Sequence, residues 1–166
     1  KYNFNHGWKV YAGPAQGAEK PGYDDSSWKS VSLPHAWNGD EAFKKDIRDL
    51  STGIAWYRKH FRLPGSGNKV FIEFEGVRQA AEVYVNGVYA GLHENGVTAF
   101  GFDISELVHF GGEDNVIAVR TDNDWDYLER STGTRFQWSD RNFNANYGGI
   151  PKNVILHVTG RVYQTL

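Results

Sequence analysis

The feature that most constrains the fold is a succession of short apolar runs separated by glycine and asparagine turns. Asn86-Gly87 joins two such runs, and this pair favours a type I′ hairpin because both residues tolerate positive φ. Residues 69–75 alternate apolar and polar side chains, which is the period of a strand with one buried face. Since no segment sustains a helical period over several turns, the sequence predicts antiparallel strands joined by turns.

Other runs show the same period. In residues 55–63, Tyr57 and Phe61 are expected to face the core, while Arg58 and Arg62 are expected to face solvent. Strands are predicted at residues 55–63, 69–75, 82–85, 88–91, 97–104, 115–121 and 153–159. Strands that recur at short intervals between such turns are typical of an antiparallel β-sandwich or jelly roll, so the expected fold class is all-β.

Composition argues against several classes of function. The chain has 166 residues, the size of one domain, and its net charge of −2 disfavours a nucleic-acid or anionic-membrane partner, since both require a clustered basic face. No apolar run approaches the roughly 20 residues that cross a bilayer. Cysteine is absent, which excludes disulfides, thiolate nucleophiles and thiolate metal ligands. We expect no cofactor.

Two long stretches, residues 35–52 and 122–149, interrupt the strand pattern. Structureless loops of this length are uncommon in compact domains and are usually functional or disordered. The second stretch is too rich in aromatic residues for a disordered segment, so we expect it to be ordered against another part of the molecule. In the first stretch, His35 is expected to hold the loop through backbone hydrogen bonds rather than to act as an acid or base.

Asp122, Asp124 and Asp126 mimic the opening of a calcium-binding loop. The match fails further along, because Tyr127 stands where the loop needs glycine and Gly133 stands where it needs glutamate. An EF-hand site is excluded on these grounds. A looser site with oxygen ligands stays open, but no metal site is predicted.

Other residues that could take part in catalysis or binding also have a structural interpretation. Trp8, Trp28 and Trp56 are expected in the core or in an interface. Glu73 and Glu75 share one face of a predicted strand, where alternating glutamates usually face solvent. No catalytic role is therefore expected for this pair.

A series of motifs runs through the chain. The segments are 24–28 (DDSSW), 31–38 (VSLPHAWN), 53–61 (GIAWYRKHF), 74–77 (FEGV), 81–87 (AEVYVNG), 100–107, 117–123 (IAVRTDN) and 148–156. In this order they resemble the sugar-binding domain of glycoside hydrolase family 2, and most of all its β-galactosidase branch. The chain departs from the family pattern at Ala36, where Asp is usual, and at Pro151-Lys152, where Tyr-Arg is usual. Pro151 is also expected to remove a hydrogen-bond donor at the start of a strand.

The resemblance implies a domain plan. In the family, an N-terminal galactose-binding-like jelly roll precedes an immunoglobulin-like sandwich and a (β/α)8 barrel that carries two catalytic glutamates. Retaining hydrolysis needs two carboxyl groups about 5 to 5.5 Å apart. Residues 1–166 are therefore expected to form the single N-terminal sugar-binding domain of a retaining, exo-acting enzyme, without catalytic residues of their own. The absence of methionine at position 1 agrees with a chain trimmed from a longer product.

The resemblance also implies substrate-binding residues, because the family's first domain lends loops to the mouth of the barrel pocket. Residues 135–147 combine aromatic faces with planar amides, a chemistry suited to sugars. The substrate-binding candidates are Trp138, Asp140, Asn144 and Asn146 in this stretch, and Asn38 and Asp46 in the first long stretch. The alternative is that these loops pack on their own domain, with asparagines in local Asx turns, or against a neighbouring domain.

Three functions stay open from the sequence. The first is an accessory domain that completes a β-galactosidase-like pocket, with a carbohydrate and the barrel as partners. The second is a self-sufficient carbohydrate-binding module, and the third is a β-sandwich interaction module. Oligomerisation of the full-length enzyme stays open. A bacterial origin and a periplasmic or extracellular location are favoured over a cytoplasmic one, and an apolar patch left bare by absent neighbours is expected.

Overall fold

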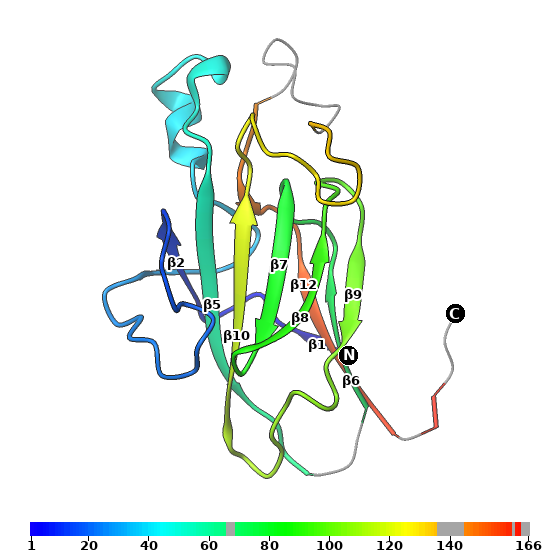
Figure 1. Cartoon of the computed structure of the whole chain (residues 1–166). Coiled ribbons are helices and arrows are strands. Elements are labelled where there is room, and N and C mark those ends of the chain that lie inside the picture. Colours follow the sequence, from blue (N-terminus) through cyan, green and yellow to red (C-terminus); the bar gives the residue numbers. More distant parts are fainter. Residues whose placement is uncertain (66–68, 136–144, 161, 164–166) are drawn as a thin grey trace.

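The computed structural model describes residues 1–65, 69–135, 145–160 and 162–163, which form a sandwich of antiparallel sheets (Figure 1). The larger sheet has the order β3 (Lys29–Val31), β2 (Trp8–Ala12), β5 (Ile54–Arg62), β10 (Asp114–Asp122), β7 (Ala80–Val85) and β8 (Val88–His93). The smaller sheet has the order β1 (Tyr2–Asn3), β12 (Val154–Thr159), β6 (Lys69–Phe74) and β9 (Phe100–Asp103). The predicted all-β fold class is confirmed.

Short elements at one end of the sandwich complete the fold. A third sheet pairs β4 (His35–Ala36) with β11 (Gly149–Ile150). Two 3₁₀ helices, η1 (Gly39–Phe43) and η2 (Ile47–Asp49), lie in the first long stretch. Among the described residues, no helix has the length and apolarity to cross a membrane.

The predicted Asn86-Gly87 hairpin forms between β7 and β8. Asn86 has a φ of 51° and Gly87 a φ of 83°, the positive values that a type I′ turn requires. The Asn86 side chain also holds the loop beside it, because Nδ2 donates to Leu107 O and to Asn115 Oδ1, each at 2.8 Å. Its Oδ1 accepts from Val116 N at 2.9 Å, which ties the hairpin to the start of β10.

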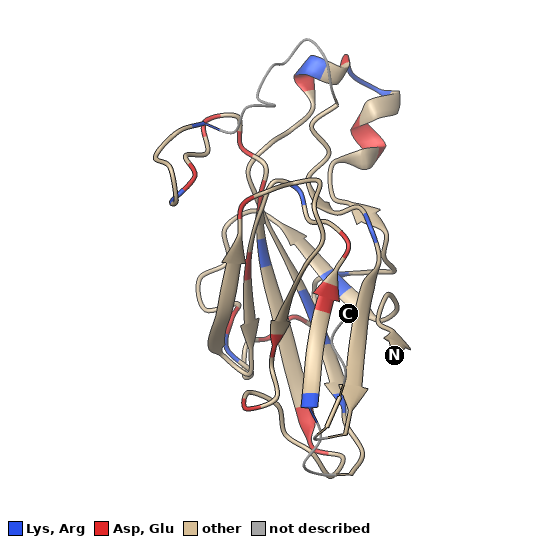
Figure 2. Cartoon of the chain, turned by 90° about the vertical axis from the view of Figure 1, so that its right-hand side faces the viewer, with Lys and Arg blue, Asp and Glu red and all other residues tan. Residues whose placement is uncertain are grey.

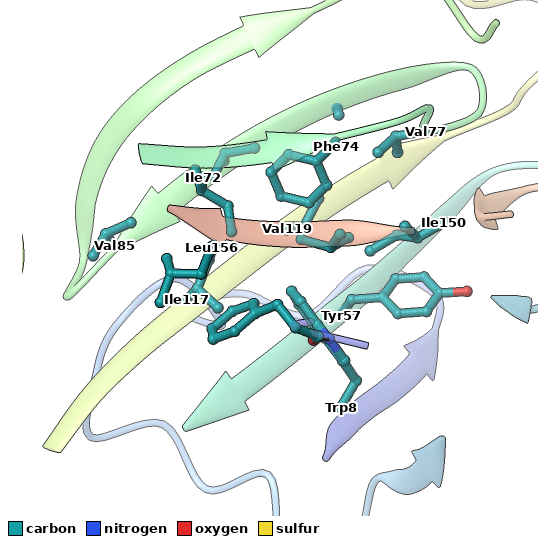
Figure 3. Packing of buried hydrophobic residues seen from close by; sticks show 14 of the residues in the cluster. Trp8, Tyr57, Ile72, Phe74, Val77, Val85, Ile117, Val119, Ile150 and Leu156 are labelled. Atoms are coloured by element: carbon teal, nitrogen blue, oxygen red, sulfur yellow. Dashed lines mark hydrogen bonds between the residues drawn. The ribbon is translucent and has the colours of Figure 1, made fainter. Parts of the chain in front are cut away.

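The core lies between the sheets and is built from alternate residues of facing strands (Figure 3). On β6, Val70, Ile72 and Phe74 are fully buried, as the alternation predicted. On β10, Ile117 and Val119 point to the same space from the larger sheet. Burial of each such side chain contributes about 1.5–3 kcal/mol, so these alternating positions carry much of the fold's stability.

The outer face of the larger sheet is also covered, which the strand pattern did not predict. The expectation that Arg58 faces solvent is wrong, because its side chain is fully buried beneath residues 18–25. Its Nε donates to Asp25 Oδ2 at 2.8 Å, and its remaining nitrogens donate to backbone carbonyls of the covering segment. The tryptophans expected in the core or an interface are buried, namely Trp8, Trp28 and Trp56.

The two departures from the family pattern lie near β11. Ala36 stands in β4 opposite Gly149. Pro151 lies in the link between β11 and β12, outside both strands. The expected loss of a donor at the start of a strand is therefore wrong, because β12 begins only at Val154.

Candidate functional site

The two long stretches meet at one end of the sandwich, where β5 begins and β10 ends (Figure 1). One strand of the smallest sheet comes from each stretch, so Ala36 lies opposite Gly149 and His35 lies opposite Ile150. The expectation that the second stretch is ordered against another part of the molecule is confirmed for its described residues.

Asn38 ties the two stretches together from the inside. Its side chain is buried, with Nδ2 donating to Ser51 O and to Asn146 O, each at 2.8 Å. Its Oδ1 accepts from Gly148 N at 3.0 Å. Because the carboxamide uses both donor hydrogens and its acceptor on backbone groups, Asn38 positions the loops rather than facing solvent.

Asn123 and Asn146 form a second, reciprocal contact. Asn146 Nδ2 donates to Asn123 O at 2.7 Å, and Asn123 Nδ2 donates to Asn146 O at 2.9 Å. Asn123 Oδ1 also accepts from Gly53 N at 3.2 Å, which adds the chain just before β5. These three buried residues, Asn38, Asn123 and Asn146, are called the asparagine clamp below.

Two glycines let the clamp close. A Cβ added at Gly148 would overlap Trp37 Nε1 and Asn123 Oδ1. Gly149 has a φ of +113°, which side chains rarely adopt, and its Cβ would overlap the Tyr57 hydroxyl. A side chain at either position would therefore push the second stretch away from its anchor.

His35 and Tyr57 support β4. The Nδ1 of His35 lies 2.9 Å from Tyr57 Oη, and the Tyr57 hydroxyl donates to His35 O at 3.2 Å. Burial, assisted by nearby Lys29, lowers the pKa of His35, so the ring is neutral at neutral pH. Burial also raises the pKa of Tyr57. These contacts agree with the expected role of His35 in holding the loop.

Glu41 closes the base of the first stretch. Its Oε2 accepts from Ser51 N at 2.6 Å and its Oε1 accepts from Ser51 Oγ at 2.8 Å. These two hydrogen bonds lower the pKa of Glu41. Asp46 lies further along the loop and is exposed, and its Oδ1 caps η2 by accepting from Arg48 N at 3.0 Å.

Two carboxylates, Glu82 on β7 and Glu94 just after β8, hold residues 127–131, and sequence reasoning missed both. Glu94 Oε1 accepts from the Tyr127 hydroxyl at 2.6 Å and from Arg130 N at 2.7 Å. Burial opposes the shift, but these bonds lower the pKa of Glu94. Glu82 Oε1 accepts from Arg130 at 2.6 Å. The available signal was an acid inside the apolar run of β7, because a buried carboxylate needs a partner.

The aspartates that mimic a calcium loop are engaged in local turns. Asp122 Oδ1 accepts from Asp124 N at 3.1 Å, and Asp124 Oδ1 accepts from Asp126 N at 2.8 Å. All three, with Tyr127, line an open hollow of about 440 Å³. The described part of the chain contains no group of three or more His, Cys, Asp or Glu side chains placed to hold a metal ion.

The predicted substrate-binding residues fall into three places. Trp138, Asp140 and Asn144 lie outside the described residues. Asn38 and Asn146 come together in the asparagine clamp. Asp46 stands apart from them, exposed at the start of η2.

Glu73 and Glu75 each have a partner of their own. Glu73 Oε2 lies 2.6 Å from His157 Nε2, on the neighbouring strand β12. Glu75 Oε2 accepts from Asn153 Nδ2 at 2.7 Å. Glu73 on β6 and Glu75 just after it therefore both contact the chain around β12.

A comparison with protein families shows to which family the chain belongs. The profile described as "Glycosyl hydrolases family 2, sugar binding domain" matches residues 13–159. The chain belongs to glycoside hydrolase family 2. The match begins at residue 13, just after β2, and runs to the end of β12, so this family's sugar-binding domain coincides with most of the sandwich. The resemblance of the motifs to this family is confirmed.

Curated relatives of this family 2 chain carry two activities in their names. A β-glucuronidase of Formosa agariphila is 39% identical over 99% of this chain. A β-galactosidase of Thermoanaerobacter pseudethanolicus is 41% identical over 73% of it. The chain spans only 18% and 16% of the length of these two proteins, respectively.

Solved structures agree with the family 2 assignment. A β-glucuronidase from glycoside hydrolase family 2 superposes with a TM-score of 0.84 at 38% identity, over 96% of this chain and 17% of its own. A β-glucuronidase of Bacteroides uniformis gives a TM-score of 0.80 at 29% identity, over 96% of this chain and 18% of its own. This chain therefore contains the sugar-binding domain of the family.

Proposed function

We propose that this chain is the accessory sugar-binding domain of a retaining, exo-acting, β-galactosidase-like enzyme. It lends loops to a pocket whose catalytic carboxylates lie outside these 166 residues. The observation that carries the proposal is the asparagine clamp, which joins the described ends of the second long stretch, near Asn123 and Asn146, to Asn38 and Ser51 in the first. Relatives named β-glucuronidase and β-galactosidase support a β-glycoside as the substrate.

In this proposal, residues 135–147 contact the sugar. Trp138 stacks on a sugar face, while Asp140 and Asn144 bridge neighbouring hydroxyls. Asn146 and Asn38 act as positioning residues, because their carboxamides hold the backbone where this segment returns to the sandwich. Asp46, exposed beside η2, forms the outer part of the rim.

Calorimetric titration of the 166-residue chain with galactose, glucuronic acid and their methyl β-glycosides tests whether the chain binds sugar without the rest of the pocket. We expect negligible heat at millimolar sugar, because one rim of a pocket offers too few contacts. Saturable binding at micromolar to millimolar Kd would instead identify a self-sufficient carbohydrate-binding module.

A substitution in the parent enzyme tests the sugar contact itself. Asn144→Ala is expected to lower kcat/KM for nitrophenyl β-glycosides by about tenfold or more, because a lost substrate hydrogen bond weakens transition-state binding by about 1–3 kcal/mol. Glu113→Ala is the control and should leave kcat/KM unchanged, because Glu113 is exposed just before β10, at the end of the larger sheet opposite the asparagine clamp. Wild-type kinetics in both Asn144→Ala and Asp140→Asn would refute the contact.

A further inference from the structure

The side chain of Phe43 is 93% exposed. Large aromatic side chains are highly buried on average, so this exposure is unusual in a structured loop. Ile47, further along the same loop, is 42% exposed. The loop therefore presents apolar side chains to solvent at the end of the sandwich that carries the candidate rim (Figure 1).

Glu41 fixes the direction of Phe43. Hydrogen bonds to Ser51, at 2.6 and 2.8 Å, turn the Glu41 carboxylate toward the base of the loop. A 3₁₀ helix has three residues per turn, so side chains two positions apart in η1 point about 120° apart around its axis. Phe43 is consequently directed away from the base of the loop.

The loop is also anchored to the sandwich. Leu50 is buried at its end, and Asn38 donates to Ser51 O at 2.8 Å. The same Asn38 carboxamide donates to Asn146 O, so the loop and the second stretch share one anchor. The backbone that carries Phe43 is thus anchored before any partner arrives, which lowers the entropy lost on binding.

Charged residues of both signs flank Phe43. Asp40 and Glu41 precede it, Lys44 and Lys45 follow it, and Figure 2 shows acidic and basic residues along this loop. Lys45 Nζ pairs with Glu41 Oε1 at 3.1 Å. An apolar centre inside a polar rim is the usual composition of a protein–protein interface, in which buried aromatic anchors carry much of the binding energy.

We propose that Phe43 inserts into an apolar recess on the catalytic part of the parent polypeptide. This inference rests on the proposed function. The β-glucuronidase of Formosa agariphila aligns with 99% of this chain, yet the chain spans only 18% of that relative, so most of the relative's length has no counterpart here. The occupant is the catalytic part because the loop shares its anchor with the candidate substrate-binding stretch.

The test compares Phe43→Ser in the 166-residue chain and in the parent enzyme. In the chain alone the Tm should stay within about 1 °C of wild type, because the ring is already in solvent. In the parent, the Tm should fall by several degrees and kcat/KM should fall with it. Phe43→Leu keeps an apolar side chain and should restore most of the Tm. Val88→Ser, 51% exposed at the Asn86-Gly87 hairpin, is the control and should change neither quantity.

An unchanged Tm of the Phe43→Ser parent would overturn the inference. So would sedimentation that shows the chain alone forming a dimer that Phe43→Ser abolishes, because the occupant would then be a second copy. Failure of the proposed function is distinguishable, since it leaves the kinetics of Asn144→Ala and Asp140→Asn at wild type while Phe43→Ser still lowers the Tm of the parent.

Discussion

Asparagine side chains join separate loops at both ends of the larger sheet. At one end the asparagine clamp binds backbone groups of both long stretches, and at the other Asn86 and Asn115 bind each other and the adjoining turns. A carboxamide offers two donor hydrogens and an acceptor on a short side chain, so it bonds to two segments at once. Sequence reasoning placed Asn38 and Asn146 in the important loops, but an amide that meets a sugar and one that meets backbone look the same in sequence.

The glycine beside the clamp has a testable role. Gly149→Ala is expected to lower the free energy of unfolding by about 3 kcal/mol or more, because the residue has a φ of +113° and the added Cβ would overlap Tyr57 Oη. Urea unfolding of the chain measures the change. Gly22→Ala is the matched control, since nothing lies within 4 Å of its added Cβ. Equal stability of the two variants would contradict the steric argument.

Acid should weaken the contact between His35 and Tyr57. The folded-state pKa of His35 is lowered, so as pH falls the unfolded state, with a pKa of about 6.5, binds the proton first. The contribution of the neutral ring to the free energy of unfolding is fully present above a pH of about 6.5 and is lost as the pH falls below it. His35→Asn should therefore lose less stability than wild type between about pH 7 and pH 5. Denaturant titrations at several pH values measure the slope, and equal slopes for His35→Asn and wild type would contradict this assignment to His35.

At the scale of elements, strand period predicted which residues share a face but not what covers each face. On β6 the inner face was predicted correctly, because Val70, Ile72 and Phe74 meet the core. On β5 the position of Arg58 on the opposite face was read as exposure. The covering segment, residues 18–25, comes from a different part of the chain, and no local pattern in β5 reports it.

The buried pair beneath that segment should be sensitive to substitution. Arg58→Met leaves the Asp25 carboxylate with Lys9 at 2.8 Å but without its buried partner, so we expect a loss of about 3 kcal/mol or more in unfolding free energy. Arg48→Met breaks an exposed pair with Asp46 and should leave the urea midpoint unchanged. Equal midpoints for the two variants would show that the covering segment is held by other contacts.

For the whole molecule, the order of motifs along the chain predicted the architecture and the family, because each motif maps to a strand or turn of the sandwich. The sequence did not indicate how structural and functional roles are divided between the two ends of the sandwich. The nine residues of β10 separate the hairpin contacts from the asparagine clamp by about 30 Å. Under the proposed function, exposed residues such as Phe43 mark the end that serves the substrate. Their partner lies outside the chain, so no pattern within the chain reports it.

This distance predicts that stability and activity separate. Asn38→Ala and Asn86→Ala should each lower the unfolding free energy of the chain by about 2–3 kcal/mol, because each leaves buried backbone groups without a partner. In the parent enzyme only Asn38→Ala should raise KM, since it lies under the proposed rim. Urea unfolding and steady-state kinetics measure the two effects. A similar rise in KM for both variants would contradict the assignment of function to one end.

The hydrogen bonds of the asparagine clamp all end on backbone atoms. These hydrogen bonds therefore do not depend on which side chains stand between Arg135 and Asn146. We therefore expect that the segment between these two residues can be replaced by one of different sequence while the flanking chain keeps its hydrogen bonds to the sandwich. Under the proposed function, substrate preference can therefore be changed by substitutions in that interval without redesign of the core.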